Sequence, residues 1–185
     1  MAERGPRERM VFSAAQLIRR DGVAATGVRD VAAHAGAPRG SLQHYFPGGK
    51  EQLVNEAVEW AGRYAAGRVA RFMERMPEPT PGGLLAAMAG QWIDEGLDAG
   101  CPVAAATIDR GGSTRAAAEA FACWARPLAE ALTGMGVPAG RAPALATLMI
   151  SAVEGALLIA RAEHDARALT AVAAELGPML DAAVA

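Results

Sequence analysis

The chain has few cysteines and few aromatic residues. Its two cysteines in 185 residues, Cys101 and Cys123, form no CxxC pair, so neither a disulfide framework nor a thiolate zinc site is supported. A redox pairing of the two thiols stays open as an alternative. Aromatic residues make up 5% of the chain, whereas apolar residues make up 52% and alanine is abundant. This composition favours helices that pack closely through small side chains, in one or two small domains.

Motifs of common catalytic and metal sites are also missing. There is no G-x-S-x-G nucleophile motif, no P-loop and no G-x-G-x-x-G motif. None of the three histidines, His34, His44 and His164, has a cysteine or carboxylate at the spacing of a zinc site. We therefore expect no catalytic residue, no metal and no cofactor, and keep an enzyme only as an alternative.

Signals for export and for membrane insertion are weak. The N-terminus, MAERGPRERM, is charged and lacks the apolar core of an export signal. The longest apolar run, residues 142–160, could cross a bilayer by length, but Glu154 near its centre and its many alanines argue against insertion. We expect a cytoplasmic protein with reduced thiols and no membrane partner.

Charge is divided unevenly along the chain. Residues 1–50 hold eight Lys and Arg against four Asp and Glu, a net charge of +4, whereas residues 51–185 hold ten against sixteen, a net charge of −6. Lys50, the only lysine, lies at this boundary. A basic end on an acidic body suits a protein that contacts DNA phosphates with one part only.

A stretch within this basic part predicts a short helix followed by a turn. Val28, Val31 and Ala32 lie at positions i, i+3 and i+4, which form one apolar helix face. Thr26 is a candidate N-cap, because its hydroxyl can accept a hydrogen bond from a free amide at the helix start. Gly36 lies where this helix must end, and glycine tolerates the left-handed conformation that a sharp turn needs.

A second short helix is predicted directly after this turn. Pro38 suits its first turn, where the missing N–H costs nothing. Leu42, Tyr45 and Phe46 again follow the i, i+3, i+4 spacing and can pack inward, which leaves a polar outer face. Helix, glycine turn and helix is the layout of a helix-turn-helix DNA reader.

The residues of this stretch carry a family resemblance. RGSLQHYF followed by PGGKEQL resembles the recognition helix and following turn of the TetR family of transcriptional regulators, and GVRDVAAHAG resembles the preceding helix. GCPVAAAT, at residues 100–107, is similar to the LmrA/YxaF-like branch of that family. One departure is Gln43, where the family often has an aromatic residue. Glutamine could instead pair with an adenine edge.

The resemblance implies a homodimer that presents two recognition helices to a double-stranded DNA operator. We expect base contacts from the second helix and phosphate contacts from its surroundings. The base-edge candidates are Arg39, Ser41 and Gln43. The phosphate candidates are Thr26, Arg29, His44, Tyr45 and Lys50, and Pro38 and Gly40 complete the predicted DNA-binding set.

The predicted fold is all-α, with two domains. Residues 1–47 form a three-helix helix-turn-helix DNA-binding domain, and residues 48–185 form a helical effector-binding and dimerisation domain. The three prolines between residues 77 and 81 must interrupt any helix. Pro127 and the pair Gly177-Pro178 should kink or split theirs. The predicted helices outside the helix-turn-helix span residues 7–20, 50–76, 83–98, 103–109, 113–133, 138–163 and 166–183.

The last two predicted helices are apolar over most of their circumference, so every side of them must be covered. Two such helices from each of two copies would close a four-helix bundle. The alternative is that both are internal to one monomer. The predicted interface residues are Leu145, Ala152, Gly155, Ala156, Ile159, Leu169, Val172 and Leu176.

The resemblance also implies a pocket for an unidentified small-molecule effector in the second domain. Its candidate apolar walls are Tyr64, Met88, Trp92, Phe121, Trp124, Met149 and Leu157. Its candidate polar anchors are Glu154 and Thr107. Glu154 needs a partner because it lies in an apolar helix, and an arginine, water or a cationic ligand could serve.

These features predict a homodimeric transcriptional repressor that binds a near-palindromic operator and is released by the effector. The alternative from another class is a helical binding or scaffold protein that does not touch DNA.

Overall fold

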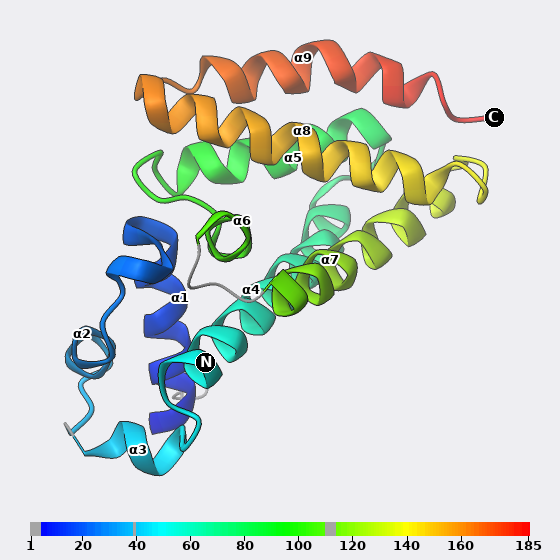
Figure 1. Cartoon of the computed structure of the whole chain (residues 1–185). Helices are drawn as coiled ribbons and strands as arrows, with labels where there is room; N and C mark the ends of the chain where they lie inside the picture. Colours follow the sequence, from blue (N-terminus) through cyan, green and yellow to red (C-terminus); the bar gives the residue numbers. More distant parts are fainter. Residues whose placement is uncertain (1–4, 39, 110–113) are drawn as a thin grey trace. The chain divides into compact units, whose positions relative to one another are not determined.

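The computed structural model describes residues 5–38, 40–109 and 114–185, and within these ranges the ordered elements are all helices (Figure 1). The predicted all-α fold is therefore confirmed. The helices are α1 (Pro6–Ala25), α2 (Val28–His34), α3 (Ser41–Tyr45), α4 (Gly49–Arg75), α5 (Pro81–Asp94), α6 (Pro102–Ile108), α7 (Thr114–Gly134), α8 (Ala142–Glu163) and α9 (Arg167–Asp181).

The chain divides into two compact units that differ from the predicted domains. The head unit comprises Met1–Arg63 and Cys101–Phe121, and the body unit comprises Tyr64–Gly100 and Ala122–Ala185. Helices α4 and α7 each contribute one part to both units. The predicted division into a DNA-binding domain of residues 1–47 and an effector-binding and dimerisation domain of residues 48–185 stays a prediction.

In the head unit, α1 packs against both α2 and α6, and α2 packs against α3. The side chains at the centre of this packing are large and apolar, and Met10, Ile18 and Phe46 are fully buried. Val31 and Leu42 extend the same core from α2 and α3. Val31 and Leu42 are therefore buried, as the apolar spacing of the two short helices predicts.

In the body unit, α9 packs against both α5 and α8, and runs antiparallel to α8 (Figure 1). Leu84, Leu169 and Leu180 are almost fully buried there. The approach of α5 to α9 depends on glycine, because a Cβ added at Gly82 would lie 2.8 Å from the carbonyl oxygen of Gly177. Asp181 adds a polar contact, since its carboxylate accepts a 2.7 Å hydrogen bond from the Gly82 amide.

Neither of the internal prolines splits its helix. Helix α7 continues through Pro127, and α9 continues through Pro178. Pro178 is exposed, and so is Ala174, whose carbonyl has lost its helical donor and can bind water instead. Gly177 is used for close packing against α5, and the helix does not end there.

Within the described ranges, α8 is long and apolar enough to cross a membrane by length and composition, with a mean hydropathy of 1.8 in its most apolar window. A core helix of a soluble protein passes the same test. Helix α8 packs against α5 and α9 and carries Glu154 near its middle. Its composition alone is therefore weak evidence for a membrane.

Candidate nucleic-acid interface

Helix α3 exposes polar side chains because its apolar side chains are buried in the core of the head unit. Leu42 is 7% exposed and Phe46, which follows the helix, is 0% exposed. Gln43 and His44 lie between them in sequence and are both exposed. A helix of only five residues has little stability of its own, so these two buried anchors hold it in place.

The turn before α3 confirms one prediction and corrects another. Gly36 has φ 61°, the left-handed conformation expected after α2. Pro38 does not open the second helix, because α3 begins only at Ser41. The carbonyl of Pro38 accepts a 2.9 Å hydrogen bond from the Ser41 amide, the i to i+3 bond of a β-turn directly before the helix. Arg39, a base-edge candidate, lies outside the described residues.

Two arginines of α1 make contacts within the protein, at the ends of α2 and α3. The guanidinium of Arg7 lies 5.2 Å from the ring centroid of Phe46 and forms a 2.6 Å ion pair with Glu56 of α4. Arg9 donates a 3.3 Å hydrogen bond to the carbonyl of Ala35, where α2 ends. Part of the basic charge counted in the sequence therefore makes internal contacts in the head unit.

Arg20, near the other end of α1, also has a partner within the protein. Its guanidinium donates hydrogen bonds of 2.9 and 2.7 Å to the two carboxylate oxygens of Asp21. These hydrogen bonds hold the pKa of the Asp21 carboxyl below its ordinary value. Both side chains are exposed, so the pair contributes little to stability, but it neutralises one of the positive charges.

Thr26 does not cap α2 as predicted. The residue before α2 is Gly27, which offers no side chain, and the Thr26 hydroxyl instead donates a 2.7 Å hydrogen bond back to the carbonyl of Gly22. Thr26 is 4% exposed. Gly22 has φ 85° and interrupts α1, which frees its carbonyl to accept this bond. The N-cap prediction is therefore wrong, and the phosphate contact of Thr26 stays a prediction that this burial does not favour.

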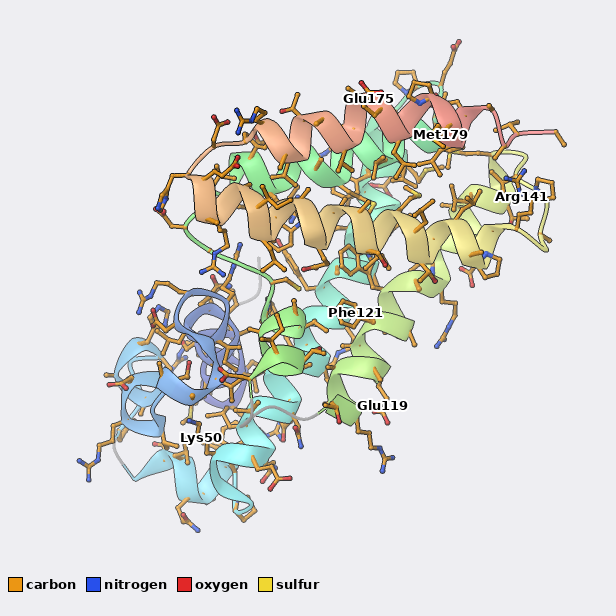
Figure 2. All side chains as sticks on the ribbon, turned by 45° about the horizontal axis from the view of Figure 1, so that its top comes forward. Lys50, Glu119, Phe121, Arg141, Glu175 and Met179 are labelled. Atoms are coloured by element: carbon orange, nitrogen blue, oxygen red, sulfur yellow. The ribbon has the colours of Figure 1, made fainter. Side chains whose placement is uncertain are left out.

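Lys50 lies in the first turn of α4, which begins at Gly49 (Figure 2). Its ammonium donates a 3.3 Å hydrogen bond to the carbonyl of Ala24. The side-chain oxygen of Gln52 accepts a 2.9 Å hydrogen bond from the Gly48 amide just before the helix. An ammonium has three donors, so Lys50 can keep this contact and still bind a phosphate.

The other predicted DNA contacts lie on the same unit and most are accessible. The exposed ones are Arg29, Pro38, Gly40, Gln43 and His44. Ser41, Tyr45 and Lys50 are half-buried. The His44 and Tyr45 rings meet edge to face at 4.9 Å, which restricts both side chains. Accessibility is compatible with the predicted roles, and each role stays a prediction.

The predicted effector-pocket residues are divided between the units. Thr107 and Phe121 belong to the head unit and the other seven to the body unit. Thr107 is exposed and donates its hydroxyl proton to the Val103 carbonyl of its own helix at 3.0 Å. Tyr64 is 37% exposed. Trp92 and Phe121 are half-buried, and the buried members are Met88, Trp124, Met149, Glu154 and Leu157. Their shared pocket stays a prediction.

The predicted dimer residues fall into two groups. Ala156 and Leu169 are 3% and 0% exposed, so they lie inside the body unit, where a second copy cannot reach them. Gly155 and Ile159 are exposed, and the half-buried members are Leu145, Ala152, Val172 and Leu176.

Sequence reasoning missed three exposed apolar side chains on the same two helices, namely Leu148, Leu158 and Met179, which are 44%, 49% and 69% exposed. Leu148 could have been found. It completes the heptad spacing of Leu145, Ala152, Gly155 and Ile159.

No group of three or more His, Cys, Asp or Glu side chains in the described ranges is placed to hold a metal ion. Cys101 is buried and Cys123 is half-buried, and neither forms a disulfide. The polar feature that stands out on the head unit is thus the exposed side of α3. Two short helices, α2 and α3, with the Gly36 turn between them and apolar side chains holding α3, form the layout of a helix-turn-helix DNA-binding protein.

Comparisons with known proteins agree with this class. Residues 13–57 match the family model described as "Bacterial regulatory proteins, tetR family", and residues 83–175 match "Transcriptional regulator LmrA/YxaF-like, C-terminal domain". An uncharacterized HTH-type transcriptional regulator of Mycobacterium tuberculosis is 41% identical over 95% of this chain and 94% of its own length. The HTH-type transcriptional regulator LmrA of Bacillus subtilis is 32% identical over 83% and 85%.

The fold is shared with solved structures. A TetR transcriptional regulator from Legionella pneumophila superposes with a TM-score of 0.78 at 22% identity, covering 97% of this chain and 100% of that one. The chain belongs to the TetR family of transcriptional regulators, with an LmrA/YxaF-like C-terminal domain. It is accordingly a DNA-binding regulator of transcription and not an enzyme.

Proposed function

We propose that this protein is a homodimeric repressor that binds a near-palindromic operator and is released by a small-molecule effector. The observation that carries the proposal is the exposed polar side of α3, held above Leu42 and Phe46. In a two-fold dimer, two such helices would enter successive major grooves about 34–36 Å apart. The operator would then show the same two-fold symmetry as the protein.

Within each half-site, Gln43 is the base-reading residue that its exposure supports best, with Arg39 and Ser41 as its neighbours. Arg29, His44, Tyr45 and Lys50 hold phosphates and set register and affinity. Because Arg7, Arg9 and Arg20 have partners within the protein, we expect the number of phosphates neutralised to be smaller than the number of basic residues suggests.

The outer faces of α8 and α9 support the proposal that the protein forms a dimer. Leu148, Leu158, Ile159 and Met179 are between 44% and 69% exposed on these two helices (Figure 2 labels Met179). Small residues lie among them, and Gly155 leaves open space around its Cα, so that a partner helix could approach closely. Covering these side chains is most simply achieved by the same faces of another copy.

Release by an effector is supported by the apolar interior of the body unit. Met88, Trp124, Met149 and Leu157 are buried there together with the carboxylate of Glu154, which is 9% exposed. A ligand that binds the DNA-incompetent conformation more tightly shifts the population toward it. Moving it from mostly bound to mostly free takes about 5.5 kcal/mol of differential affinity. A buried carboxylate favours an effector that carries a positive charge.

The test is to select duplexes from a random-sequence pool with the purified protein and to measure its mass in solution. We expect enrichment of a near-palindrome and the mass of a dimer. A monomer that shows no preference among duplexes at low ionic strength contradicts the proposal. Enrichment of sequences without two-fold symmetry would contradict the dimeric arrangement alone. We also infer a cytoplasmic location, since the protein acts on DNA.

A further inference from the structure

Helix α6 ends beside the corner that leads from α1 into the helix-turn-helix. Asp109 directly follows α6, and its Oδ2 accepts a 3.1 Å hydrogen bond from the amide of Ala24, which lies 85 residues earlier in the chain. The carbonyl of Ala24 accepts the 3.3 Å hydrogen bond from the ammonium of Lys50. Ala24 is therefore held on one side by a carboxylate and on the other by the only lysine of the protein.

The backbone of this corner is shaped for the contact. Gly22 has φ 85° and ψ 168°, which interrupts α1 and leaves residues 23–25 as a separate turn. A Cβ at Gly22 would lie 2.8 Å from Asp109 Oδ2 and would displace this carboxylate, and the positive φ itself favours glycine. The Thr26 hydroxyl closes the corner through its 2.7 Å bond to the Gly22 carbonyl.

We propose that Asp109 is a positioning residue for DNA binding, which fixes the corner at Ala24 and thereby the place of the Lys50 ammonium. This rests on the proposed phosphate contact of Lys50. Lysine has a flexible stem that loses rotamer freedom when it binds, so a preset carbonyl partner lowers the entropy cost of holding a phosphate. The end of α6 thus belongs to the DNA-binding apparatus, although Asp109 is negatively charged and unsuited to touch DNA itself.

Substitutions of Asp109 separate hydrogen bonding from charge. Both Asp109→Ala and Asp109→Asn remove a negative charge, which by itself strengthens binding to DNA. Only Asp109→Asn keeps an oxygen that can accept from the Ala24 amide. Glu119→Ala is the matched control, because Glu119 is an exposed carboxylate of the head unit whose described contact is an ion pair with Arg115 on the same helix (Figure 2).

Affinity is measured by fluorescence anisotropy, over a range of salt concentrations, on a duplex enriched by the wild-type protein and on an unrelated duplex of equal length. We expect Asp109→Ala to weaken binding to both duplexes by about threefold to tenfold, the range that one hydrogen bond supplies. Its salt slope should fall by less than the roughly one unit expected for Lys50→Ala, because the Lys50 ammonium is still present. Asp109→Asn should bind at least as tightly as wild type, because it keeps the acceptor oxygen and loses the negative charge. Binding of Asp109→Ala that equals that of Glu119→Ala overturns the proposal.

A double-mutant cycle tests whether the two residues act together. If Asp109 acts through Lys50, adding Asp109→Ala to Lys50→Ala causes no further loss of affinity. Fully additive losses would show that Asp109 acts by another route, and would refute the positioning role.

A direct readout of Lys50 distinguishes failure of this proposal from failure of the phosphate contact. Reductive methylation with ¹³C-formaldehyde labels this one side-chain amine and retains its charge, so its methyl signal in NMR reports the surroundings of Lys50. We expect Asp109→Ala to shift that signal and Glu119→Ala to leave it in place. An unshifted signal refutes the positioning of Lys50, whatever the DNA result.

A shifted signal combined with unchanged DNA binding of Lys50→Ala would instead refute the phosphate contact and leave the positioning intact. Should Asp109→Ala fail to fold, Asp109→Glu takes its place, since its extra methylene carries the carboxylate away from the tight space beside Gly22.

Discussion

The crossing of α4 and α7 in the head unit makes a sharp prediction for Gly62. A Cβ added at this glycine would lie 2.7 Å from the Cα of Ala120, and 2.8 Å from both its Cβ and its carbonyl oxygen. Two of these three atoms belong to the backbone of α7, so no rotamer change can relieve the contact. The helices would have to separate.

The magnitude follows from two opposing effects of Gly62→Ala. Replacing glycine by alanine inside a helix stabilises it by about 0.5–1 kcal/mol. Forcing extra volume into a close-packed contact costs about 1–3 kcal/mol. We therefore expect Gly62→Ala to lower the free energy of unfolding by roughly 1–2 kcal/mol, with a fall in Tm of about 2–4 °C per kcal/mol.

Gly67→Ala provides the control within the same helix. Gly67 is exposed, and a Cβ there would meet no other atom within 4 Å. We expect this substitution to raise the free energy of unfolding by about 0.5–1 kcal/mol, because only the gain in helix propensity remains. Thermal unfolding followed by circular dichroism, at one protein concentration for all variants, measures the difference.

The reasoning is refuted if Gly62→Ala is as stable as Gly67→Ala. It also predicts the outcome of a second substitution. Adding Ala120→Gly to Gly62→Ala should not restore the wild-type stability, because it leaves two backbone atoms in the clash and places a glycine inside α7.

Three further predictions concern function. Gln43→Ala should relax the preference at one base position at a cost of ~1–3 kcal/mol, and equal losses on selected and random duplexes would exclude a base contact. Ile159→Glu should shift the proposed dimer toward monomer in light scattering, since Ile159 is 51% exposed on the outer face of α8, and an unchanged mass would exclude this face from the interface. Glu154→Gln should keep the fold and lower the affinity for a cationic compound that stabilises the wild-type protein, by about tenfold or ~1.4 kcal/mol. An unchanged affinity for that compound would exclude Glu154 as its anchor.

Much of the fold could be predicted from the sequence because its signals are local. The spacing of Leu42 and Phe46 predicted which side of α3 is buried, and Gly36 takes the left-handed conformation expected of it. Helix α4 begins and ends within one residue of its predicted bounds, since glycines precede it and prolines follow it. The family motif lies in this same locally determined region.

Other features depend on tertiary contacts that no local pattern reveals. Thr26 has the residue type of an N-cap, but the break at Gly22 offers its hydroxyl a nearer partner. Ala156 and Leu169 suit a helix interface by type, but packing within one copy already buries them. Arg7 adds to the basic charge in the sequence, and in the structure its guanidinium is paired with Glu56.

The sequence by itself thus determined the helices, the family and the polar side of the recognition helix, because periodicity, glycine and proline act on neighbouring residues. Only the tertiary structure decided which charged groups make contacts within the protein. Asp109 and Ala24 are 85 residues apart, and their hydrogen bond exists because α6 packs beside α1. The direction in which two helices cross depends on all the side chains between them, so no motif records it.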